Sequence, residues 1–132
     1  MKYLLDTNTC IKFLKGTSEN IRNRVLSAEN DISLCSIVKY ELYYGAYKSK
    51  EVIDNLKKIE LFFNKFNTIL FNDRCSKICG QIRADLEKNG LPIGPYDLQI
   101  ASIALSNDLI LVTHNIKEFN RISNLRIEDW EI

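Results

Sequence analysis

The sequence predicts an α/β fold with a central parallel sheet of four to five short strands and helices on both faces. Short apolar runs alternate along the chain with longer segments of amphipathic, helical periodicity. That alternation is typical of parallel sheets whose strands are connected by helices. The chain has 132 residues, the usual length of one domain, and contains no repeat, low-complexity tract or linker. We therefore expect a single domain over residues 1–132.

The expected strands are short apolar runs bounded by residues that favour turns and helix caps. The first and the fourth are expected to be buried, and the last to lie at an edge of the sheet. They are Tyr3–Leu5, Asp31–Cys35, Thr68–Phe71 and Leu109–Val112, with Leu125–Ile127 as the edge strand.

Helices are expected between these runs, where apolar residues recur at helical spacing. Ser36 is expected to cap the helix that follows the second strand. Asn89 and Gly90 are expected to end a long helix, and Asp97 to open a central helix that is apolar nearly all round. The expected helical segments are 10–14, 21–26, 37–45, 50–65, 73–89, 97–107 and 117–122.

Composition excludes several classes of protein. Apolar residues make up 45% and charged residues 27%, which is an ordinary globular balance without a membrane-spanning run. The first residues do not have the pattern of a signal peptide, because Asp6 and Lys12 interrupt their apolar stretch. The four cysteines lack the CxxC spacing of zinc or redox sites, so we expect reduced thiols in a cytoplasmic protein. The formal net charge of +1 neither demands nor excludes a nucleic-acid partner.

Three acidic residues occupy positions that a solvated surface does not explain. Asp6 directly follows the first strand, Glu41 lies beside apolar residues on a helix, and Asp97 follows a loop rich in glycine and proline. Each also has an ordinary explanation taken alone. Asp6 and Asp97 are candidates for helix caps, and Glu41 for an ion pair with Lys39 or Lys48. Thr113 and Asn115 follow another strand and by themselves indicate only a turn.

Considered together, these residues indicate a metal site. Ligands of parallel sheets gather at the carboxyl ends of the strands, where the topology brings distant segments together. Like charges placed there repel one another unless a divalent cation neutralises them. A ligand set made of oxygens, without a cluster of histidines or cysteines, favours Mg²⁺ or Mn²⁺ over zinc.

At this point the sequence resembles the PIN-domain nucleases and, among them, the VapC toxins of type II toxin–antitoxin systems. Four matching motifs, in the same order and at similar separations, cover essentially the whole chain. They are LLDTN at Leu4–Asn8, SIVKYELYYG at Ser36–Gly45, GPYDLQIASIAL at Gly94–Leu105 and LVTHNIKEFNRISNLRIEDW at Leu111–Trp130.

The resemblance implies a PIN-like three-layer sandwich and assigns roles to individual residues. Asp6, Glu41 and Asp97 become the acidic cluster, with Asp6 and Asp97 as direct ligands of Mg²⁺ or Mn²⁺, and Thr113 supports the site. The chain departs from the family at Asn115, where a fourth acid is common, which puts a second metal in doubt. Glu118 is the nearest other acid, and we expect it on the helix surface.

The implied activity is metal-dependent hydrolysis of RNA phosphodiesters without a covalent intermediate. Similar toxins often cleave transfer RNA, including the initiator, usually form homodimers, and are silenced by a VapB-type antitoxin whose tail covers the acidic groove. A tyrosine-rich segment (Tyr40, Tyr43, Tyr44 and Tyr47) is either a dimer or antitoxin surface or a simple cover for neighbouring helices.

Two other functions remain open at this point. A haloacid-dehalogenase-type phosphatase also begins with a strand that ends in Asp, but its DxDxT signature differs from the sequence here at Asn8. Asn8 cannot act as the general acid of such an enzyme. The other alternative, motivated by Asn115, is a catalytically weak PIN fold that serves as an RNA-binding or assembly module.

Overall fold

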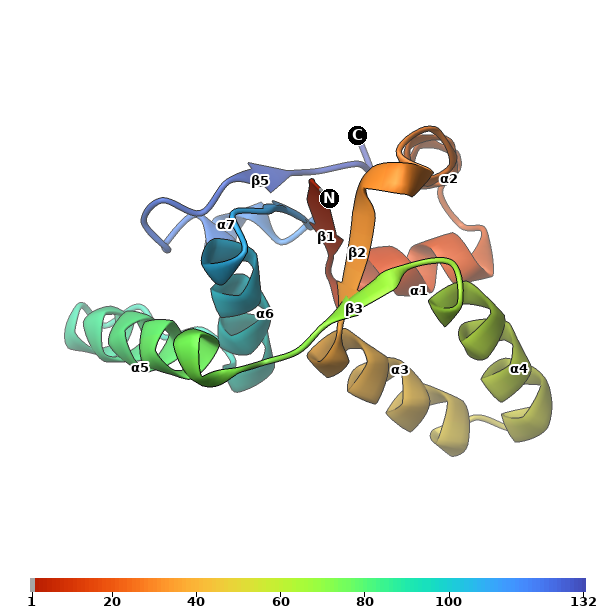
Figure 1. Ribbon diagram of the computed structural model, residues 1–132, viewed down its shortest axis with the longest axis horizontal. Helices are drawn as coiled ribbons and strands as arrows, with labels where there is room; N and C mark the ends of the chain where they lie inside the picture. Colours follow the sequence, from red (N-terminus) through yellow and green to blue (C-terminus); the bar gives the residue numbers. More distant parts are fainter. Residues whose placement is uncertain (1) are drawn as a thin grey trace.

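Five short strands form the centre of the protein in a computed structural model that describes residues 2–132 (Figure 1). Their order is β3-β2-β1-β4-β5, and all pairings are parallel. The chain passes from β1 outward to β3 and then crosses over to β4, so the strand order reverses between β1 and β4. Open parallel sheets bind their ligands beyond the strand ends at such a point. The strands are β1 (Tyr3–Leu5), β2 (Ile32–Cys35), β3 (Asn67–Ile69), β4 (Ile110–Val112) and β5 (Ile127–Glu128).

Helices flank the sheet in a three-layer arrangement, which confirms the expected fold class. In Figure 1, α3 and α4 form one pair of packed helices and α5 and α6 form another, on opposite sides of the view. The helices are α1 (Thr7–Lys15), α2 (Glu19–Ser27), α3 (Ser36–Lys48), α4 (Val52–Phe63), α5 (Asp73–Lys88), α6 (Pro95–Ser106) and α7 (Ile116–Phe119).

The core lies where the central strands meet α6. Strands β1 and β4 are buried along their whole length, as expected for strands covered on both faces. Helix α6 buries half of its residues, from Leu98 to Ala104, which confirms that it is central. Near the end of the chain, Trp130 is 1% exposed and meets the ring of Tyr3 edge-on, with 4.9 Å between centroids. The segment after β5 is thereby fastened to the first strand.

The differences from the expected elements lie at their ends. The expectation that Ser36 caps α3 is wrong, because Ser36 is the first residue of the helix and no side chain makes the cap hydrogen bond. Helix α6 begins at Pro95 and not at Asp97. Proline suits the first helical position, since the N–H that it lacks would have no partner there.

The outer strands are shorter or shifted relative to the expectation. Strand β3 ends at Ile69, and Leu70 beyond it is 63% exposed. The last strand lies at 127–128 and not at 125–127, and the short helix α7 ends at Phe119. A 3₁₀ turn, η1 (Glu29–Asp31), precedes β2 and was not predicted. Across residues 2–132, no helix is both long and apolar enough to cross a bilayer.

Candidate active site

Asp6 lies at the end of β1, beside the point where the strand order reverses. Asp6 is 5% exposed, and its carboxylate accepts a hydrogen bond from the backbone N–H of Thr9 at 2.9 Å. Burial raises the pKa of Asp6, while hydrogen bonds from Thr113 and Thr9 and the charge of Lys12 act in the opposite direction. Asp6 therefore does cap α1, as its position allowed, but the cap bond uses only Oδ1. A cap and a ligand position are compatible in this side chain.

Glu41 extends from α3 toward the start of α1. Its Oε1 accepts a hydrogen bond of 2.6 Å from the hydroxyl of Thr7, and its side chain is half-buried. The alternative of an ion pair with Lys39 or Lys48 is wrong. The ammonium group of Lys39 lies over the ring of Phe63, and that of Lys48 over the ring of Tyr44. The Glu41 carboxylate thus has an orienting hydrogen bond but no neutralising lysine among these two.

Asp97 is the third residue of α6 and is half-buried. Its pKa is raised to about 6 by burial first, and then by the charges of Asp6, Glu118 and Glu41. The positive end of the helix favours the ionised carboxylate, whereas burial and the three like charges act against it. The same result puts acids of three other segments within electrostatic range of Asp97.

Thr113 and Asn115 connect the end of β4 to this acidic group. Thr113 is fully buried, and its hydroxyl oxygen accepts a hydrogen bond of 3.0 Å from the backbone N–H of Asn115. The amide of Asn115 in turn donates to Oε2 of Glu118 at 3.1 Å. The amide nitrogen of Asn115 therefore orients an acid.

Glu118, which was expected on the surface of its helix, is a further acid near this group. It is half-buried on α7, and its charge contributes to the raised pKa of Asp97. The available signal was its spacing, three residues after Asn115, which brings two side chains to the same face of a helix.

The chemistry of the donors suits a hard cation. Asp6, Glu41, Asp97 and Glu118 offer only oxygen atoms, which Mg²⁺ and Mn²⁺ prefer. Two thiols nearby do not add to this set. Cys10 and Cys35 are fully buried, and burial together with the charges of Asp6 and Glu41, respectively, raises the pKa of each thiol above its ordinary value.

No three of these carboxylates, however, lie within 4.8 Å of one another. Over residues 2–132, only His114, Asp129 and Glu131 bring three potential ligand atoms within 4.8 Å of one another. That group is not the predicted one, and Lys12 already pairs with Glu131 at 2.6 Å. Mg²⁺ usually keeps several water molecules and binds through one or two carboxylates, so a loosely spaced set of acids still fits it.

Asn8 has no place in this site. It is exposed, whereas Asp6, two residues earlier, is buried. In the phosphatase signature, both positions must face the same phosphate. The geometry therefore gives no support to a phosphatase of the haloacid-dehalogenase type.

Comparison with known proteins agrees with the fold. The family profile described as the PIN domain matches residues 3–125, which is nearly the whole chain. This match defines the class of protein.

Curated relatives and a solved structure narrow the class further. The chain is 42% identical to the tRNA(fMet)-specific endonuclease VapC of Salmonella typhimurium, over 98% of each chain. It is 41% identical to the ribonuclease VapC2 of Rickettsia felis, over 99% of each. The crystal structure of DNA-bound VapBC from Salmonella typhimurium superimposes with a TM-score of 0.94 over 98% of each chain, at 42% identity. The chain belongs to the VapC family of PIN-domain proteins.

Proposed function

We propose that this protein is a divalent-metal-dependent endoribonuclease that acts as the toxin of a VapBC toxin–antitoxin pair. The observation that carries the proposal is the position of Asp6, buried at the switch point of the sheet, with the charges of Asp6, Glu41 and Glu118 acting on Asp97. Acids from four segments would not be held near one another at a buried strand end without a cation to offset their repulsion. The ribonuclease names of its relatives supply the reaction.

The proposed site divides into ligands and the residues that orient them. Asp6 and Asp97 would hold Mg²⁺ or Mn²⁺ directly, with Glu41 beside them. Thr9 and Thr113 fix the carboxylate of Asp6 by hydrogen bonds. A bound divalent cation would polarise the phosphoryl oxygens and make a water molecule a better nucleophile at neutral pH.

Further residues orient the acids that flank the ligands. Thr7 fixes Glu41 with a bond of 2.6 Å, and Asn115 fixes Glu118 with one of 3.1 Å. Glu118 supplies a fourth carboxylate in spite of the neutral Asn115. This weakens the reason for considering a catalytically silent RNA-binding module.

The proposed substrate is transfer RNA, with the initiator tRNA as the first candidate. This rests on the name of the Salmonella relative, which is a tRNA(fMet)-specific endonuclease. The proposed partner is a VapB-type antitoxin, because related chains occur in VapBC complexes. We also propose that the toxin is a homodimer.

A groove beside the acidic site suits such a partner. It has a volume of ≈ 560 Å³, lies between α1, α3 and α4, and includes Glu41 in its wall. Its lining combines aliphatic side chains with two lysines, as expected for a site that binds an amphipathic protein segment. The residues concerned are Ile11, Leu14, Leu42, Ile59, Lys15 and Lys58.

The function is tested by cleavage of initiator tRNA in magnesium buffer. Replacement of either ligand, Asp6→Asn or Asp97→Asn, is expected to lower the rate about 100-fold or more, the scale for removing one electrostatic stabiliser from an active site. Asp85→Asn, which changes an exposed acid on α5, serves as the matched control and should retain full activity. Cleavage that is unchanged in the ligand variants, or that persists in excess EDTA, would overturn the proposed mechanism.

A further inference from the structure

Two tyrosines stand next to two of the acids. Tyr40 directly precedes Glu41 on α3, and Tyr96 directly precedes Asp97 in the first turn of α6. Both are large aromatic residues that the fold leaves in contact with solvent, 51% and 42% exposed, respectively. Neither has a role in the core that would explain an aromatic ring at its position.

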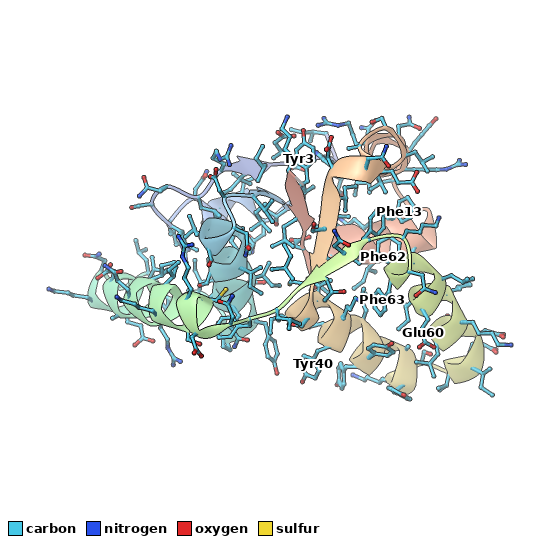
Figure 2. The ribbon with its side chains drawn as sticks, viewed as in Figure 1. Tyr3, Phe13, Tyr40, Glu60, Phe62 and Phe63 are labelled. Carbon is cyan, nitrogen blue, oxygen red and sulfur yellow. The ribbon has the colours of Figure 1, made fainter. Side chains whose placement is uncertain are left out.

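The two rings form one unit that connects α3 and α6. Their centroids are 5.5 Å apart, their planes are inclined at 67°, and their hydroxyl oxygens lie 3.1 Å from each other. In Figure 2, Tyr40 lies on the side of α3 that faces away from the strands. Edge-to-face contact and a hydrogen bond together restrict the rotation of both rings, so the pair is a preformed aromatic corner at the rim of the acidic site.

The other tyrosines of α3 behave differently. Tyr43 packs edge-to-face on Phe63 of α4, at 5.4 Å, and donates a hydrogen bond to Glu60. It therefore covers a neighbouring helix, which was one of the two explanations for this tyrosine-rich segment. Tyr44 and Tyr47 are exposed toward the end of α3, about one and two helical turns away from Tyr40.

The charge of the site decides what an aromatic corner can contribute there. The four carboxylates repel the phosphates of RNA. A lysine or arginine at the rim would attract those phosphates, but it would also compete with the cation for the carboxylates. A neutral ring binds a base through its face and carries no charge. Single-stranded RNA is commonly recognised by splaying out its bases and stacking them on aromatic side chains.

We infer that Tyr40 and Tyr96 form a platform on which an unpaired base next to the scissile phosphodiester stacks. One ring supplies the stacking face, and the other holds that ring in place by its edge-to-face contact. The pair would thus be a determinant of substrate position and base preference for the proposed ribonuclease, and the inference rests on that proposed function. It favours RNA over a protein as the occupant of this surface.

The test uses hairpin RNAs with a seven-nucleotide loop, each with one abasic position in the loop. Tyr40→Ala and Tyr96→Ala should raise the KM for the intact hairpin about 5- to 150-fold, the equivalent of about 1–3 kcal/mol for one stacked base. Tyr40→Phe and Tyr96→Phe keep the ring and should remain within about threefold of the wild type. Tyr47→Ala, on the same helix and 64% exposed, is the matched control and should behave as wild type.

The abasic hairpins separate stacking from a merely structural effect on Asp97. Where the stacked base is missing, the wild type should lose the same factor, and the alanine variants should lose nothing more. A fall in kcat with unchanged KM, equal for every hairpin, would contradict the inference, as would alanine variants that cleave like the wild type. So would a weaker complex with the antitoxin while RNA cleavage stays unchanged.

Binding of a fluorescein-labelled hairpin, followed by anisotropy, separates this inference from the proposed function. If the wild type binds but does not cleave, the ribonuclease proposal fails. The stacking inference is then decided by whether the alanine variants bind 5- to 150-fold more weakly. If the wild type neither binds nor cleaves any hairpin, both are overturned.

Discussion

Asp97→Asn should stabilise the protein in the absence of a divalent cation while lowering its activity about 100-fold or more. The pKa of Asp97 rises from 3.8 to about 6 through burial and the charges of three other acids. One pKa unit corresponds to about 1.36 kcal/mol, so the full effect is about 3 kcal/mol. Because the side chain is only half-buried, solvent screening reduces the expected gain to about 1–2 kcal/mol.

The direction of the pH dependence follows from the raised pKa. Between pH 3.8 and about 6, the folded protein retains a proton on Asp97 that the unfolded chain has already lost. The stability of the wild type therefore falls as the pH rises through this window, and the whole cost is present above pH 6. Asparagine has no such cost, so the advantage of the variant should be absent below pH 3.8 and complete above pH 6.

Urea unfolding in EDTA, repeated from pH 3.5 to pH 8, measures this difference. Asp85→Asn is again the control, since this exposed acid should change the free energy of unfolding by no more than about 0.5 kcal/mol. A variant that is less stable than the wild type at pH 8, or a difference that does not depend on pH, would refute the account of mutual repulsion among the acids.

Three further predictions concern the cation, an orienting residue and the end of the chain. Magnesium at 100 times its Kd should stabilise the wild type by about 2.7 kcal/mol in thermal unfolding, and this gain should vanish in Asp6→Asn; an equal gain in both would place the binding elsewhere. Thr7→Val removes the hydrogen bond to Glu41 and should slow RNA cleavage about 10- to 100-fold, whereas Thr7→Ser should retain the rate; equal rates for the two variants would exclude this role. Trp130→Ala should cost about 3–5 kcal/mol in urea unfolding because the ring is buried against Tyr3; a loss below 1 kcal/mol would show that this contact does not fasten the chain end.

The elements that the sequence predicts well are those determined by local pattern. The first and fourth strands and α6 were predictable because their apolar residues leave no alternative to burial. Asp6 could be singled out because it directly follows such a strand. Its position at a strand end depends only on the chain on either side of it.

The features that could not be predicted depend on contacts between distant segments. The pKa of Asp97 is raised first by burial and then by the charges of Asp6, Glu41 and Glu118, which lie 91, 56 and 21 positions away in the chain. The role of Glu118 depends on the hydrogen bond from Asn115, which exists only because a helix of four residues starts there. Ser36 resembled a cap in sequence, but the preceding strand ends one residue before it and α3 begins immediately.

The central claim is that Asp6 and Asp97 hold a divalent cation at the switch point of the sheet. An anomalous difference map from crystals soaked in Mn²⁺ tests it most directly. We predict a peak between the carboxylates of Asp6 and Asp97 that disappears in Asp97→Asn. A peak confined to His114, Asp129 and Glu131, or no peak near Asp6 at saturating Mn²⁺, would contradict it.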